Sequence, residues 1–207
     1  MNSRTADQNL SWYRGFIQGK TRIILAWVFV LLLIFFAKHY PTWPGMVLCG
    51  IGAVLRFWAS GYLRKDTRPA VGGPYAFVRN PLYLGTYLMA VGTALSVDNG
   101  WLLGSATFVF AGIYHFIILD EEVKLQKIFK QPYRDYCRKV PRFFPRIWPP
   151  CFPASEQALL KINPERSHLR FSWSLAMKNK AYEAFASFLG LMAFVSVMAY
   201  LWQNFSI

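Results

Sequence analysis

The sequence has few residues of several kinds that commonly carry chemistry. Only 10 of its 207 residues are acidic, and it contains three cysteines and three histidines. The cysteines form neither a CxxC pair nor a zinc-ligand spacing, and their odd number argues against a disulfide framework. We also find no glycine-rich dinucleotide fingerprint and no internal repeat. The sequence therefore predicts no metal site and no soluble nucleotide-binding fold.

Charged residues are scarce but strongly biased in sign. They make up 16% of the chain, 55% of it is hydrophobic, and the formal net charge is +13. An average globular chain is about 45–50% apolar and about 25% charged. This hydrophobicity excludes a disordered chain, and the long apolar blocks favour an integral membrane protein. Because no soluble basic face collects the positive charge, nucleic-acid binding is not predicted.

Five apolar blocks predict an all-α, multi-pass bundle of five transmembrane helices that forms a single membrane domain, 1–207. A span needs about 20 residues, and the shorter blocks reach this length with interfacial residues at their ends. Asp98-Asn99-Gly100 alone separates blocks three and four, which predicts a tight hairpin. The spans are expected at about 23–38, 45–63, 82–97, 101–119 and 184–202.

Basic residues alternate between the connections and so predict the orientation. They are frequent before residue 23, in 64–81 and in 120–183, whereas the connection after the first span carries only Lys38. Since cytoplasmic loops collect Lys and Arg, the N-terminus is expected in the cytoplasm and any cofactor pocket on that side. Within 151–183 we expect interfacial helices with these membrane-facing residues: Leu159, Leu160, Ile162, Leu169, Phe171 and Trp173.

The first cluster with chemical potential lies at the start of the third span. A glycine-proline turn at Gly72-Gly73-Pro74 leads to Arg79, Asn80 and Pro81. Proline at the first helical position leaves the other free backbone N–H groups available to an anion such as a carboxylate or phosphate. Tyr83 lies about one turn further on. The structural alternative is an ordinary helix start with a snorkelling arginine.

The second cluster, Asp120-Glu121-Glu122, follows the fourth span. Three acids at this helix end oppose the helix dipole and lie on the basic side of the protein. The arrangement suits a cationic ligand group such as an amine or a sulfonium, and the alternative is that solvated acids balance nearby lysines. His115 shares a helix face with Glu122, where it is either a core histidine or a base.

Arg56 lies inside the second predicted span. Arginines in such positions usually face the bundle and have a partner. Glu121, Glu122 or a substrate carboxylate could be that partner, and snorkelling to the inner surface is the alternative.

Two motifs carry a resemblance to a known family. The segments GPYAFVRNPLYLG and EEVKLQKIFKQPYRDYCRKVPRFFP together resemble the membrane methyltransferases of the isoprenylcysteine carboxyl methyltransferase and phospholipid methyltransferase superfamily. The likeness covers 72–145, within a methyltransferase-like core at 64–150. It implies S-adenosylmethionine as the cofactor, in a cytoplasmic pocket. Asn80 departs from the pattern, which has histidine there, and an amide does not titrate near neutral pH.

The resemblance also implies roles for individual residues. Arg56 or Arg142 would orient an anionic substrate head, and Glu121 or Glu122 would contact the cofactor's amino group or sugar hydroxyls. We therefore expect Arg56, Arg142 and Glu122 as catalytic residues. The acceptor is expected to be an amphiphile that enters from the bilayer, either a carboxylate, a thiol or an amine. The expected cofactor-binding residues are Tyr75, Arg79, Asn80, Pro81, Tyr83, Gly85, Glu121, Glu122 and Tyr133.

Two other functions are compatible with parts of the sequence. The ending Tyr136-Cys137-Arg138-Lys139-Val140-Pro141 is similar to that of the sterol reductases, which would bind NADPH. A small non-enzymatic membrane protein, such as an assembly factor, would have no affinity for either cofactor. Binding of the two cofactors distinguishes these hypotheses.

Overall fold

The computed structural model describes residues 20–64, 69–148 and 170–205, so most of the predicted interfacial segment lies outside it. Within the described residues all regular structure is helical, which confirms the all-α prediction. The elements are α2 (Lys20–Phe36), α3 (Trp43–Ser60), η1 (Gly73–Ala76), α4 (Pro81–Ser96), α5 (Gly100–Val109), η2 (Phe110–Tyr114), α6 (His115–Lys139), α8 (Trp173–Lys178) and α9 (Tyr182–Phe205).

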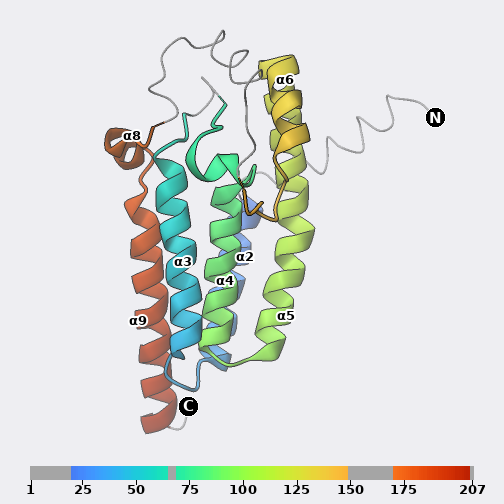
Figure 1. Ribbon diagram of the computed structural model, residues 1–207. Helices are drawn as coiled ribbons and strands as arrows, with labels where there is room; N and C mark the ends of the chain where they lie inside the picture. Colours follow the sequence, from blue (N-terminus) through green and yellow to red (C-terminus); the bar gives the residue numbers. More distant parts are fainter. Residues whose placement is uncertain (1–19, 65–68, 149–169, 206–207) are drawn as a thin grey trace, which may run out of the picture.

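The long helices lie lengthwise beside one another in a bundle, with η1, α8 and the far half of α6 gathered at one end (Figure 1). Each predicted span overlaps one of these helices. The fourth differs most, because α5, η2 and α6 follow one another without an intervening loop at 100–139, with a kink inside α6 at Lys130. We placed its end at residue 119, where the apolar residues stop. The helix continues because its next turns pack against the loop before α4.

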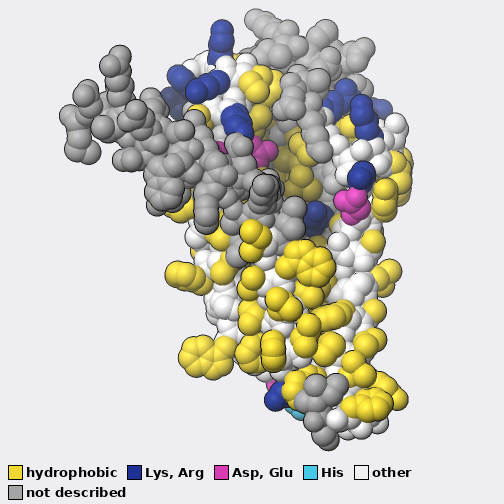
Figure 2. Space-filling model, turned by 180° about the vertical axis from the view of Figure 1, so that it is seen from behind, with side chains coloured by type: hydrophobic (Ala, Val, Ile, Leu, Met, Phe, Trp, Pro, Cys, Tyr) yellow, Lys and Arg dark blue, Asp and Glu magenta, His cyan; other side chains and the backbone are white. Residues whose placement is uncertain are grey.

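Two helical stretches of the described chain have the length and apolar composition to cross a membrane, 100–139 and Tyr182–Phe205. Ala26–Phe36 is a shorter apolar helix. Hydrophobic side chains cover the middle and lower surface, whereas Lys and Arg gather at the end that holds α6 and α8 (Figure 2). This distribution agrees with the charge pattern of the sequence, and the crossing of the membrane by all five predicted spans stays a prediction.

Helices α3 and α4 make the closest contact in the bundle, through glycines. A Cβ at Gly92 would lie 2.4 Å from the backbone nitrogen of Cys49, and one at Gly52 would lie 2.6 Å from the carbonyl oxygen of Gly85. Small residues let helix backbones approach in this way in membrane proteins. The pair α3–α4 is therefore the rigid part of the fold that supports the site.

Helix α8 closes the end of α3. The Asn179 side chain donates hydrogen bonds to the carbonyl oxygens of Ser60 (2.9 Å) and Leu63 (2.6 Å), which the end of a helix leaves without partners. Phe171, one of the residues expected to face the membrane, is half-buried and packs on Phe57, with ring centroids 6.0 Å apart. The interfacial segment thus returns to the bundle before α9 begins.

Replacement of Asn179 by alanine should lower the free energy of unfolding by about 1–2 kcal/mol, because two carbonyl groups at the end of α3 lose their donor. Thermal unfolding in detergent micelles measures this change. Asn204→Ala is the matched control, since its amide donates to the carbonyl of Tyr200, one turn earlier on the exposed surface of α9. Equal unfolding midpoints for the two variants would contradict the capping role.

Candidate functional site

The two sequence motifs meet in space through backbone and side-chain hydrogen bonds. The backbone N–H of Arg79 donates to the carbonyl of Pro141 (2.9 Å), and that of Arg146 donates to the carbonyl of Phe77 (3.0 Å). The Tyr136 hydroxyl donates to the carbonyl of Tyr75 (2.8 Å). The loop before α4 and the segment after α6 therefore form one unit at the end of the bundle.

Asn80 contributes to this unit as a hydrogen-bond donor. Its side-chain amide donates to the carbonyl of Arg142 at 3.0 Å. The bond needs an N–H group and no change of protonation, so asparagine can make it in the place of the histidine of the family pattern.

Glu122 is the central ionic contact of the unit. It is 4% exposed and accepts from Arg79 Nη1 (2.9 Å), Arg142 Nε (3.0 Å) and Arg142 Nη2 (2.9 Å). The hydrogen bond to Glu122 raises the pKa of Arg142 above its ordinary value, so this arginine stays charged. His115 lies on the same helix face but is exposed, because this loop unit covers the face only at the level of Glu122.

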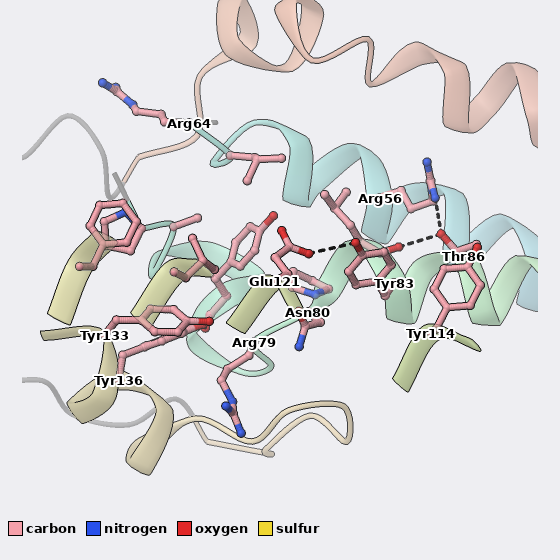
Figure 3. A pocket seen from close by; sticks show the side chains of 18 residues that line it. Arg56, Arg64, Arg79, Asn80, Tyr83, Thr86, Tyr114, Glu121, Tyr133 and Tyr136 are labelled. Carbon is pink, nitrogen blue, oxygen red and sulfur yellow. Dashed lines mark hydrogen bonds between the residues drawn. The ribbon is translucent and has the colours of Figure 1, made fainter. Parts of the chain in front are cut away.

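A cavity of about 500 Å³ lies between this unit and the ends of α3 and α4 (Figure 3). Its volume is within the range of small-molecule sites, about 300–1,000 Å³. The lining residues are Arg56, Leu63, Arg64, Pro69, Ala70, Tyr75, Arg79, Asn80, Pro81, Leu82, Tyr83, Thr86, Tyr114, Glu121, Leu125, Phe129, Tyr133 and Tyr136.

Most of the expected site residues lie on the cavity wall, and three do not. The wall includes Arg56, Tyr75, Arg79, Asn80, Pro81, Tyr83, Glu121 and Tyr133. Glu122 and Arg142 lie behind it, paired with each other. Gly85 lies under the Arg56 side chain, since a Cβ there would be 2.6 Å from Arg56 Cγ.

The sequence reasoning missed several wall residues, and some had a visible signal. Leu125 and Phe129 are four residues apart on α6, and Tyr136 follows the expected Tyr133 by three residues, spacings that put each pair on one helix face on either side of the kink at Lys130. Thr86 and Tyr114 had no such signal, because their positions depend on how α4 and η2 pack against each other.

The cavity has two chemically different ends. Tyr133 and Tyr136 lie at one end, with ring centroids 5.8 Å apart, and Arg56, Thr86 and Tyr114 lie at the other (Figure 3). Glu121 and Tyr83 lie between them, joined by a hydrogen bond from the Tyr83 hydroxyl to Glu121 Oε2 at 2.9 Å. The ion pair of Arg56 with Glu121 or Glu122, one of the alternatives above, is not formed.

Tyr75 brings a buried hydroxyl group to the cavity wall. The residue is 6% exposed, and its hydroxyl has no hydrogen-bond partner among the described residues. Burial, with the nearby Glu121 carboxylate and the Tyr83 hydroxyl, raises its pKa well above the ordinary value, so the hydroxyl is a neutral donor. Buried polar groups are normally paired, and this one is therefore available to a ligand in the cavity.

A cluster of aromatic side chains from α4, η2 and the segment after α6 lies beside the cavity. Phe110 stacks on Tyr114 with ring centroids 4.2 Å apart and also packs on Tyr87 and Phe143 at 4.8 and 5.6 Å. The π-helical turn η2 carries Phe110 and Tyr114. Such turns are frequent at functional sites, and this one places the ring of Tyr114 on the cavity wall.

Comparison with known proteins finds one family model and two relatives that resemble this chain. The sequence model of the phospholipid methyltransferase family matches residues 40–132. The chain is 28% identical over 169 residues to the nickel-cobalt-cadmium resistance protein NccN of Alcaligenes xylosoxydans xylosoxydans, an alignment that covers 77% of this chain and 78% of that protein.

A second relative is the protein-S-isoprenylcysteine O-methyltransferase of Schizosaccharomyces pombe. It is 32% identical over 83 residues, which cover 40% of this chain and 35% of that protein. No solved structure matches the chain significantly. The match to the family model and the two relatives support the likeness carried by the two motifs, which is to the superfamily of membrane methyltransferases that includes the phospholipid and isoprenylcysteine methyltransferases.

Proposed function

We propose that this protein transfers a methyl group from S-adenosylmethionine to an amphiphilic acceptor at the inner face of a membrane. The observation that carries the proposal is the cavity in which both motifs take part, with the unpartnered Tyr75 hydroxyl and the Glu121 carboxylate on its wall. The protein would cross the membrane five times, with its N-terminus and the cavity on the cytoplasmic side. The basic residues gathered at that end of the bundle support this orientation.

The wall residues fit the parts of such a cofactor. Tyr75, Phe129, Tyr133 and Tyr136 offer aromatic surface for a purine ring. The Tyr75 hydroxyl would satisfy its missing hydrogen bond with a polar group of the cofactor. Glu121 Oε2 accepts from Tyr83, and the carboxylate has further acceptor capacity for an amino group or for sugar hydroxyls. Its negative charge also favours a cation in the cavity.

S-adenosylmethionine supplies a methyl group that its sulfonium already activates. The protein's own contribution is therefore mainly to align the reactants and to exclude water. Arg79, Glu122 and Arg142 would act as positioning residues, since they hold the loop before α4 against the segment after α6. A carboxylate or thiolate acceptor needs no base, whereas an amine or hydroxyl would have to lose a proton.

Thermal unfolding of the purified protein in lipid nanodiscs tests cofactor use. S-adenosylhomocysteine at a hundredfold excess over its Kd should stabilise the protein by about 2.7 kcal/mol, and NADPH should not. Tyr75→Phe should weaken S-adenosylhomocysteine about fivefold, because one hydrogen bond is lost. Its stability without ligand should not fall, because that hydroxyl has no partner among the described residues. Tyr200→Phe, on the exposed part of α9, is the control.

The outcome also separates the alternative functions. Stabilisation by NADPH alone would support a reductase of the sterol-reductase kind, and indifference to both compounds would support a non-enzymatic membrane protein. Transfer of labelled methyl groups to total membrane lipid and to prenylcysteine analogues then tests the reaction itself. The proposal requires a labelled product in at least one of these pools.

A further inference from the structure

The end of the cavity beside α3 and α4 contains a cation, Arg56, that forms no ion pair with the described residues. We propose that Arg56 binds an anionic head group of the acceptor, a carboxylate or a phosphate, and so makes the enzyme selective for anionic amphiphiles. The inference rests on the proposed function, which leaves the charge of the acceptor open.

The fold carries the Arg56 side chain into the cavity. Arg56 lies about one turn before the end of α3, and its stem passes over Gly85 of α4, where a Cβ would lie 2.6 Å from Arg56 Cγ. The Tyr-Leu-Gly ending of the first motif therefore has a specific function. The glycine leaves the space through which an arginine of the neighbouring helix reaches the wall.

The Arg56 guanidinium has one hydrogen-bond partner in the described chain, and that partner is neutral. Its Nη1 donates to the hydroxyl oxygen of Thr86, and this hydroxyl in turn donates to the carbonyl of Leu82 at 3.0 Å. The direction of the two bonds fixes Thr86 as an acceptor toward Arg56. A guanidinium has five N–H donors, so further donors remain for a ligand.

The nearby carboxylates are engaged elsewhere. Glu122 is shared by Arg79 and Arg142, and Glu121 accepts from Tyr83. Glu183 interacts electrostatically with Arg56 but forms its ion pair with Lys180, at 3.5 Å. No ion pair of Arg56 is formed within 20–64, 69–148 and 170–205. Of the two arginines considered for the substrate head, Arg142 is therefore neutralised and Arg56 is not.

The physical cost of this arrangement points to a ligand. A charge inside a membrane bundle is unfavourable unless it is paired. An anion in the cavity would supply the missing partner through charge-assisted hydrogen bonds, which are stronger than those of neutral groups. A phosphate or carboxylate matches the planar donor fork of arginine.

The position of Arg56 favours the acceptor over the cofactor as the source of this anion. Arg56 and Thr86 lie at the opposite end of the cavity from Tyr133 and Tyr136, with Glu121 and Tyr83 between them (Figure 3). A cofactor base placed among the tyrosines leaves the Arg56 end for the second reactant. This end lies along α3 and α4, so the chain of an amphiphile could remain in the bilayer while its head reaches the cavity.

Four ligands with the same farnesyl chain test the selectivity: farnesylthioacetate, its methyl ester, farnesyl phosphate and farnesylamine. Their Kd values are measured on the full-length protein in neutral-lipid nanodiscs saturated with S-adenosylhomocysteine. At least one anion should bind about tenfold more tightly than the ester and the amine. The two anions distinguish a carboxylate head from a phosphate head. Arg56→Met should abolish the preference, and Arg134→Met, an exposed residue of α6, should retain it.

Binding of S-adenosylhomocysteine separates the two proposals. Arg56→Met should bind it as the unaltered protein does, which also shows that the variant is folded. Reduced binding by a folded variant would place the cofactor's carboxylate at Arg56 and overturn the assignment. Equal affinities for the four farnesyl ligands, or binding of none of them, would also overturn it while leaving cofactor use intact. Because the ligand series is measured first on the unaltered protein, a misfolded variant does not remove the test.

Discussion

Replacement of Glu122 by glutamine is expected to lower the free energy of unfolding by about 3 kcal/mol. Removing one member of a buried ionic group costs about 3–5 kcal/mol, because the remaining charges stay buried without compensation. We expect the lower end of that range because the Arg142 side chain is 37% exposed and water screens part of its charge. Chemical unfolding in detergent micelles, followed by circular dichroism, measures the change.

Glu121→Gln is the matched control, since it makes the same chemical change one residue away. Glu121 is exposed on the cavity wall, and its carboxylate accepts a hydrogen bond from the neutral Tyr83 hydroxyl instead of pairing with an arginine of the described chain. This variant should keep its stability and lose affinity for S-adenosylhomocysteine, whereas Glu122→Gln should show both defects through a loosened loop unit. A stable Glu122→Gln protein with normal cofactor affinity and a reduced kcat would instead make Glu122 a catalytic residue, as first expected from the sequence.

Replacement of Gly92 by valine is expected to be as damaging, at about 3 kcal/mol or more. The first added carbon would lie 2.4 Å from the backbone nitrogen and 2.8 Å from the Cα of Cys49. These atoms belong to the facing helix and cannot rotate away, so α3 and α4 must separate, and overpacking of this kind costs about 1–3 kcal/mol or more. The unfolding midpoint in micelles should fall accordingly.

Gly104→Val provides the comparison for this prediction. Gly104 lies on α5 with nothing within 4 Å of an added Cβ, so it shares the helix-propensity change without the steric one. If both valines cost the same, the α3–α4 contact would not explain the loss, since the propensity change from glycine to valine is not itself destabilising. A separated α3–α4 pair should also displace Arg56 from Thr86, so Gly92→Val should weaken binding of an anionic amphiphile.

The helices of this protein could be predicted from local sequence because local rules set them. The apolar blocks form helices, and a proline can mark where a helix starts, as Pro81 does for α4. Asp98-Asn99-Gly100 forms the predicted turn, in which the Asn99 side chain caps α5 by accepting from the backbone of Leu102 at 2.9 Å. Helical structure continues past residue 119, the predicted end of the fourth span, because hydropathy reports the membrane boundary and not the end of the helix.

The composition of the site was also largely present in the sequence, as two motifs of the right order and spacing. What the sequence could not decide was the role of each residue within them. Glu121 and Glu122 are adjacent and chemically alike, yet successive residues of a helix point about 100° apart. One carboxylate consequently faces the cavity, and the other faces two arginines from distant parts of the chain.

The distribution of acidic and basic residues along the chain and the pairing of their charges have different physical origins. The sequence by itself determined that the chain is helical and that its bases collect at one end, because hydropathy and charge act residue by residue. Only the tertiary structure decided which bases are neutralised, because pairing depends on which side chains the packing of α3, α4 and α6 brings within reach. That packing gives Arg79 and Arg142 a shared carboxylate and leaves Arg56 with a hydroxyl.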